Sequence, residues 1–316
     1  MSSHTTPPLD SEQDAIIVGG GIAGLQAALQ LGRYGYRVLV VDAGRGRSTL
    51  CRGYHNVLGW PDGVSGAELR RLGRQQAEAV GVRFADDEIV QAAARPDEAG
   101  GGFVLDGRQE GEGAYRSRLL LLATGIMDRF PALPGLEICL GKSVYVCPDC
   151  DGYEIKGHPT VVLGAGSVGA SMALTLTYWN DRLVYVNHEQ KEIEAELLAE
   201  LERHGIEVVS EPIVRVLERE DGCFEGVELA DGRVVPGERG FIAFGGNRVH
   251  SELAQQLGVE RMDNRHIVTD PRSKMTNVPG VWAAGDVAVH SEQVTIAMGE
   301  GSQAAIWMHK TLMRQA

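Results

Sequence analysis

The sequence has few cysteines and no long apolar run, and both shortages narrow the class of protein. Five cysteines in 316 residues are too few for the disulfide framework of small secreted domains. No apolar stretch approaches the roughly 20 residues that a membrane-spanning helix needs. The first ten residues are polar and contain proline, unlike a signal peptide. Residues 1–11 are therefore expected to be a disordered lead-in, and the expected location is a reducing cytoplasm.

Positive charge is also scarce. Lysine and arginine number 30 against 43 aspartates and glutamates, which gives a formal net charge of -13. Such a field repels phosphate backbones and anionic lipid surfaces, so neither nucleic acid nor membrane is an expected partner. The length and a hydrophobic content of 43% are sufficient for two domains of ordinary size.

The first unit of the chain begins with an apolar run at residues 14–18, which has the length and branching of a buried parallel strand. This run leads directly into glycines and then into a helix expected at residues 22–34. A second apolar run at residues 37–42 ends in Asp42. Strand, glycine turn, helix and strand together predict one right-handed crossover unit.

The glycines of this turn have the spacing of a dinucleotide-binding motif. Gly19 permits the tight turn, Gly21 lets the backbone approach a pyrophosphate, and Gly24 lets the helix pack closely on the strand. The helix N-terminus offers unpaired N–H groups to the phosphates. Asp42 can accept hydrogen bonds from both ribose hydroxyls of an adenosine. A purely structural turn is the alternative, and the combination of strand, glycines, helix and acid argues against it.

The same pattern returns in the second half of the chain. A strand, a glycine turn, a helix and a second strand are expected at residues 160–163, 164–169, 168–179 and 183–186, and a further helix is expected near residues 191–204. The glycines are Gly164, Gly166 and Gly169, and the second strand runs into Asn187, His188 and Glu189. A repeat of more than a hundred residues indicates duplicated domains. Here a retained fold whose nucleotide site has decayed stays open, because no arginine after the strand stands ready for a 2′-phosphate.

The end of the chain is expected to return to the first domain. A strand at residues 281–286 and a closing helix at residues 294–313 follow the second unit, which is already complete without them. Together these patterns predict an α/β protein with two Rossmann-like dinucleotide-binding domains.

Two cysteines stand close together just before the second strand-and-glycine unit. Cys147 and Cys150 are separated by two residues, and at a helix start such a pair can close a redox-active disulfide. Half of a zinc site is the competing interpretation, but the chain has no second close pair; an inert core pair also stays open. Asp151 follows directly and could relay a proton or simply be a solvated acid at a helix start.

In combination, these motifs resemble one family, the low-molecular-weight bacterial thioredoxin reductases. The matching stretches fall in order and cover about the whole chain after the lead-in: residues 18–24, 56–61, 123–125, 147–152, 164–166 and 283–286. The resemblance implies three-layer ββα domains, with the second inserted into the first. Residues 12–122 and 241–316 would bind FAD, and residues 123–240 would form the pyridine-nucleotide-type domain that carries the cysteine pair. It also implies a homodimer and a rotating insert.

The resemblance further implies roles for individual residues. Cys150 would face the flavin, Cys147 would attack the disulfide of the partner, and Asp151 matches the acid of the family. The FAD-binding residues would be Gly19, Gly21, Ala23, Gly24, Asp42, Asn56, Thr124, Gly125, Gly285, Asp286, Gln293 and Val294. A nicotinamide dinucleotide would contact Gly164, Gly166, Gly169, Asn187 and Glu189. The partner would be a thioredoxin-like protein or a small disulfide or dithiol.

The chain departs from the family after the second strand of the insert. Family members that use NADPH carry His-Arg-Arg there, whereas this chain has Asn187, His188 and Glu189. A carboxylate near a 2′-phosphate costs on the order of 1 to 4 kcal/mol at about 4 Å, so NADH is expected as the donor and NADPH is disfavoured. Another reductant, or a dithiol oxidase that passes electrons from a dithiol through flavin to oxygen, stays open.

Overall fold

The computed structural model describes residues 11–96, 101–289 and 292–315. Ten of the eleven residues of the expected lead-in therefore lie outside the described residues. The chain divides into two compact units, each built from more than one segment. Unit 1 comprises Met1–Thr49, Ala67–Met127 and Val249–Ala316, and unit 2 comprises Leu50–Gly66 and Asp128–Arg248. The assignment of FAD to residues 12–122 and 241–316, and of a nicotinamide dinucleotide to residues 123–240, remains a proposal.

Unit 1 is built on a seven-stranded mixed sheet with β3-β2-β1-β6-β5-β4 in order and β17 paired with β6. Strands β1, β2, β3, β6 and β17 run parallel where they pair, and β4, β5 and β6 pair antiparallel. The strands are β1 (Gln13–Val18), β2 (Val38–Asp42), β3 (Arg83–Asp86), β4 (Ile89–Ala94), β5 (Phe103–Gly107), β6 (Gly111–Leu122) and β17 (Val281–Ala283).

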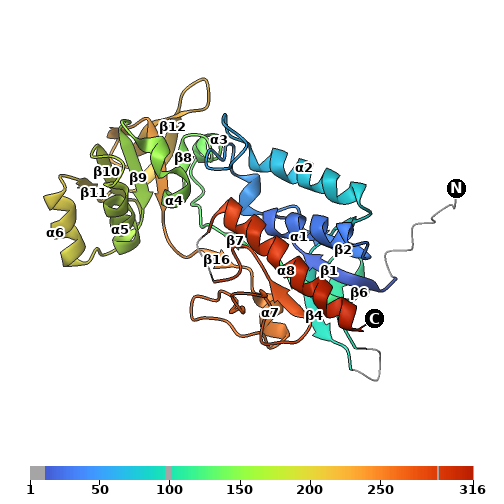
Figure 1. Cartoon of the computed structure of the whole chain (residues 1–316). Coiled ribbons are helices and arrows are strands. Elements are labelled where there is room, and N and C mark those ends of the chain that lie inside the picture. Colours follow the sequence, from blue (N-terminus) through green and yellow to red (C-terminus); the bar gives the residue numbers. More distant parts are fainter. Residues whose placement is uncertain (1–10, 97–100, 290–291, 316) are drawn as a thin grey trace. The chain divides into compact units, whose positions relative to one another are not determined.

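Both faces of the unit 1 sheet are buried. Ala15 and Ile17 of β1 point into one apolar cluster, and Ile16 and Val18 point into another. This alternation explains why the strand reads as a continuous apolar run. The cluster that contains Ala15 and Ile17 packs against helices α1 (Ile22–Arg33) and α8 (Val294–Gln315), which lie side by side (Figure 1). The helices of this unit are α1 (Ile22–Arg33), η1 (Arg47–Thr49), α2 (Gly66–Ala79), α7 (Glu252–Gln256) and α8 (Val294–Gln315).

Unit 2 has three layers. Its central sheet is parallel, in the order β11-β10-β9-β15-β8, and a separate antiparallel sheet contains β12, β13 and β14. Val161 and Leu163 of β9 point toward the antiparallel sheet, whereas Val162 points toward α5 (Gly166–Leu176). The strands are β8 (Val144–Tyr145), β9 (Thr160–Gly164), β10 (Leu183–Asn187), β11 (Glu207–Val209), β12 (Ile213–Glu218), β13 (Phe224–Leu229), β14 (Val234–Pro236) and β15 (Arg239–Ala243). The predicted α/β class with two Rossmann-like units is confirmed.

The two helices predicted in unit 2 are shorter than expected. The helices of unit 2 are α3 (Leu136–Cys139), α4 (Pro148–Asp151), η3 (Gly152–Ile155), α5 (Gly166–Leu176) and α6 (Ala195–Arg203). Two short strands, β7 (Ile126–Met127) and β16 (Arg248–Val249), pair with each other at positions in the chain where one unit ends and the other begins. The helix expected from Lys191 begins only at Ala195. Asn187 donates to the carbonyl of Lys191 at 2.7 Å, and Ser167 accepts from the N–H of Glu194 at 3.0 Å. These bonds hold the segment as a loop.

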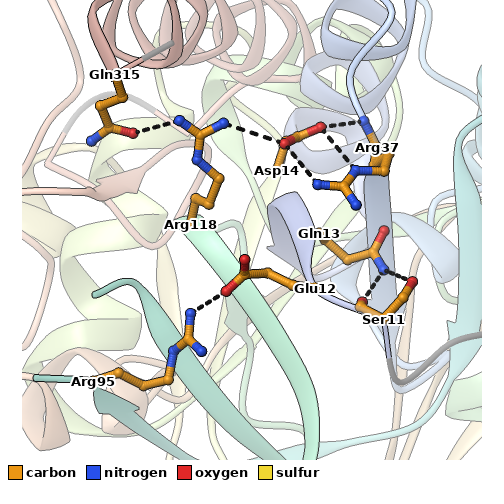
Figure 2. A network of polar contacts seen from close by, with 8 residues as sticks. All are labelled: Ser11, Glu12, Gln13, Asp14, Arg37, Arg95, Arg118 and Gln315. Atoms are coloured by element: carbon orange, nitrogen blue, oxygen red, sulfur yellow. Dashed lines mark hydrogen bonds and ion pairs between the residues drawn. The ribbon is translucent and has the colours of Figure 1, made fainter. Parts of the chain in front are cut away.

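A polar network ties the start of β1 to its neighbours in unit 1 (Figure 2). The carboxylate of Asp14 accepts from the backbone and side chain of Arg37 and from Arg118, which also donates to Gln315. Burial alone would raise the pKa of Asp14, but these hydrogen bonds and the two positive charges hold it below its ordinary value. The network therefore stabilises the fold above the ordinary aspartate pKa, and this contribution is lost as the pH falls through the lowered value.

The contact between α1 and α8 yields a stability prediction. A Cβ at Gly301 would lie 2.2 Å from the carbonyl oxygen of Ala23, whereas a Cβ at Gly299, two residues earlier on α8, would meet nothing within 4 Å. We expect Gly301→Ala to lower the free energy of unfolding by about 1 to 3 kcal/mol because the helices must separate. Gly299→Ala, the control, should raise it by about 0.5 to 1 kcal/mol. Urea unfolding of both variants measures the difference, and equal stabilisation by both would contradict the close packing.

Candidate functional site

The first glycine turn combines tight packing with an open space. A Cβ at Gly19, whose φ is +107°, would lie 2.3 Å from the carbonyl oxygen of Ala123, and one at Gly24 would lie 2.0 Å from the carbonyl oxygen of Gly19. Both positions thus require glycine for internal packing. A Cβ at Gly21 would meet nothing within 4 Å, and no side chain caps the helix that begins there. The start of α1 can therefore receive an anionic group such as the pyrophosphate of FAD.

Asp42 lies beside this turn, at the carboxyl end of β2. A Cβ at Gly20 would be 2.9 Å from its carboxylate. Arg70 of α2 donates to Asp42 Oδ2 at 2.7 Å. The sequence analysis did not identify Arg70, because it lies 28 residues after Asp42 and outside the glycine motif.

The predicted residues near the C-terminus join the same end of the sheet. A Cβ at Gly285 would lie 2.8 Å from Cβ of Ala23. The N–H of Gly285 donates to Glu300 Oε2 at 3.0 Å, and Lys274 lies 2.8 Å from the other oxygen of Glu300. The Lys274 and Glu300 side chains are only 12% and 7% exposed, so this ion pair is a buried support for the Gly285 turn that the sequence did not indicate.

The remaining predicted FAD residues divide between the two units. Thr124 donates to the carbonyl of His250, whose N–H donates to the carbonyl of Gly125, so these residues join the C-terminal segment of unit 1. Arg47 lies 3.6 Å from Asp286 in the same unit. Val294 is buried at the start of α8, directly after Gln293. Asn56 is exposed and belongs to unit 2.

The second glycine turn is more crowded than the first. A Cβ at Gly164 would lie 2.7 Å from the carbonyl oxygen of Ala243, and one at Gly169 would lie 2.4 Å from the Tyr185 ring. Unlike Gly21, Gly166 is also enclosed, with the carbonyl oxygen of Glu192 2.8 Å from the position of a Cβ. Its N–H donates to Asn187 Oδ1 at 2.9 Å. Asn187 thus satisfies a group that a phosphate would otherwise bind.

Glu189 is held by two cations, one of which is an arginine from a distant part of the sequence. Arg129 donates to Glu189 Oε1 at 2.7 Å, and Lys191 Nζ lies 2.7 Å from Oε2. The hydrogen bond from Arg129 is the main reason that the pKa of Glu189 falls to about 2. Arg129 lies 60 residues before Glu189, outside every motif of the second unit, so no sequence pattern indicated it.

Cys147 and Cys150 form a disulfide, with 5.3 Å between their Cα atoms. Cys147 is the residue before α4, and Asp151, the last residue of α4, donates its N–H to the carbonyl of Cys147 at 2.9 Å. Both cysteines and Asp151 are half-buried. A disulfide between these two cysteines can accept two electrons.

Cys139 lies in a different environment. Cys139 is fully buried, and burial is the main reason that its pKa rises to about 11. A thiol with that pKa is almost entirely protonated at neutral pH and is a poor nucleophile.

Within the residues that the structure describes, no helix is long and apolar enough to cross a membrane.

Comparison with known proteins agrees with this geometry. The family model described as pyridine nucleotide-disulphide oxidoreductase matches residues 13–301. A probable thioredoxin reductase of Arthroderma benhamiae is 30% identical over 98% of this chain and 83% of its own length. The thioredoxin reductase of Aquifex aeolicus is 27% identical over 96% of this chain and 94% of its own.

A solved structure is also similar to the chain along nearly all of its length. The crystal structure of HlmI matches with a TM-score of 0.85 and 30% identity, over 96% of this chain and 93% of that one. The glycine turns, the acids that follow the second strands and the cysteine pair thus occur in a chain that is similar to these proteins along nearly all of its length. The chain therefore belongs to the pyridine nucleotide-disulphide oxidoreductase family, and within it is a thioredoxin reductase-like flavoprotein disulfide oxidoreductase.

Proposed function

We propose that the protein passes electrons from NADH through FAD to the Cys147–Cys150 disulfide, and from there to a thioredoxin-like protein or a small disulfide. The observation that carries the proposal is the disulfide itself, which lies on a short helix with an acid directly after it. A homodimer is proposed by analogy with the family.

The open first turn suits FAD. Gly21 leaves room for the pyrophosphate at the start of α1, and Asp42 stands where the adenosine ribose would lie. Gly285 and Asp286 would hold the ribityl and phosphate portion. When bound, FAD supplies a carrier that takes two electrons from a nicotinamide and gives them to a disulfide.

The cysteines would complete the transfer by thiol–disulfide exchange. Reduction of Cys147–Cys150 takes two electrons and two protons and yields two thiols. The Cys147 thiolate attacks the disulfide of the partner and releases one partner thiolate, and Cys150 then displaces the second one, which restores the internal disulfide. Asp151 is close in sequence to both sulfurs and would hold or return the proton of the attacking thiol.

A competing function is a dithiol oxidase, in which a dithiol reduces the cysteine pair and oxygen finally takes the electrons. The crowding at Gly166, with its N–H already bonded to Asn187, favours this alternative, because an oxidase has no need of a nicotinamide dinucleotide. The same cysteines would serve both functions, and the direction of electron flow separates them.

Anaerobic titration of the oxidised holoprotein should decide between the two functions. We expect NADH to bleach the flavin absorbance rapidly and NADPH to do so at least tenfold more slowly, because Glu189 disfavours the 2′-phosphate. Absence of bleaching by either nucleotide, together with peroxide formed from a dithiol under air, would establish the oxidase instead.

The roles of the two cysteines predict distinct variants. Cys147→Ser and Cys150→Ser should each lower the reduction of a disulfide substrate at least a thousandfold, since exchange needs both sulfurs. Both variants should keep bound flavin, because the first glycine turn is untouched. Cys223→Ser, at a half-buried cysteine outside the disulfide, is the matched control and should keep its activity. Turnover of a chromogenic disulfide measures all three, and an active Cys147→Ser variant would contradict the assignment.

A further inference from the structure

Arg129 crosses the carboxyl end of the parallel sheet in unit 2. Its guanidinium donates to the carbonyl oxygens of Gly245 and Phe244, just after β15, at 3.0 and 2.9 Å. Its remaining nitrogen donates to Glu189, two residues after β10. Strand β9 lies between β15 and β10 in the sheet. The side chain therefore passes the end of β9, where the second glycine turn begins and where a doubly wound sheet binds its ligand.

Glu189 is an anion between two cations. Arg129 contacts one carboxylate oxygen and Lys191 contacts the other, each at 2.7 Å. The three side chains together carry one net positive charge. Unit 1 has only the simpler arrangement, in which a single cation, Arg70, contacts Asp42 among the interactions that the structure describes. Unit 2 thus has one more cation at the position that recognises the adenosine ribose.

The arrangement matches a phosphate site that is already filled. Two cations that point at one group are suited to bind an oxyanion with several acceptor oxygens, such as a phosphate. Here the carboxylate of Glu189 takes the place of such an oxyanion, because it contacts both Arg129 and Lys191. We propose that Arg129 and Lys191 form a latent 2′-phosphate-binding pair, and that Glu189 occupies it as an internal anion and so limits unit 2 to dinucleotides without that phosphate. The inference rests on the proposed function only in that unit 2 binds a nicotinamide dinucleotide.

This explanation differs from simple repulsion by the carboxylate. If Glu189 only repelled the phosphate, its neutralisation would make NADP⁺ and NAD⁺ bind equally. If it occupies two donors, its neutralisation also frees Arg129 and Lys191, and the preference should invert. A charge-assisted hydrogen bond to each freed cation is worth roughly a factor of ten or more in affinity.

Calorimetric titration of the oxidised holoprotein tests the proposal without turnover. The probes are NAD⁺, NADP⁺ and adenosine 2′,5′-bisphosphate, and the variants are Glu189→Gln and Glu189→Gln combined with Lys191→Met. Lys191 is 60% exposed, so its replacement should not disturb the fold, whereas Arg129→Met removes bonds to two backbone carbonyls. We expect Glu189→Gln to bind NADP⁺ and the bisphosphate at least tenfold more tightly than the original protein, with NAD⁺ changed less than threefold. In the double variant, the added Lys191→Met should weaken the binding of NADP⁺ and the bisphosphate about tenfold relative to Glu189→Gln alone.

Two results would overturn the proposal. Equal affinity of Glu189→Gln for NAD⁺ and NADP⁺, unchanged by Lys191→Met, would show repulsion alone. Absence of binding of any probe to all variants would show that unit 2 is not a dinucleotide site. Reduction of disulfides by the flavin and the cysteine pair is measured separately, so either result leaves the proposed disulfide chemistry to its own test.

Discussion

Close approach of backbone to backbone at the carboxyl end of a central strand is the constraint on which the first site depends. Helix α1 can begin against the end of β1 only with glycine at position 24, because a Cβ there would lie 2.0 Å from the carbonyl oxygen of Gly19. Glycine is also needed at position 19, where a Cβ would lie 2.3 Å from the carbonyl oxygen of Ala123, just after β6. That approach directs the first N–H groups of α1 into the open space at Gly21. Asp42 and the Gly285 turn then lie around one location because parallel strands end at the same edge of the sheet.

The second unit repeats the constraint but not its result. Gly164 and Gly169 are again required by close contacts, so the strand and helix meet as in the first unit. The loop after β10 then folds over the start of α5, where Asn187 binds the N–H of Gly166 and the carbonyl of Lys191. Arg129 fastens this loop to the end of β15 through Glu189. Similar glycine motifs therefore precede both helices, but the start of α1 is open, whereas the N–H of Gly166 at the start of α5 is already hydrogen-bonded within the unit.

The predictable parts are those set by short stretches of sequence. The continuous apolar run of β1 predicts a strand buried on both faces, and its residues do alternate between two clusters. The cysteine spacing predicts a disulfide at a helix start, and the structure has both. The start of α6 was predicted four residues too early, because helical propensity carries no information about the bond from Asn187 that holds residues 191–194 in a loop.

Short stretches of sequence are sufficient to predict the α/β class, the two glycine turns and the cysteine pair, since each depends on backbone geometry or covalent reach within a few residues. Which charges meet the acids of the two sites depends instead on how distant segments fold together. Arg70 and Arg129 reach Asp42 and Glu189 from 28 and 60 residues away. The physical reason is that a long, flexible arginine pairs with whichever carboxylate the fold brings within hydrogen-bonding distance, and no local pattern encodes that meeting.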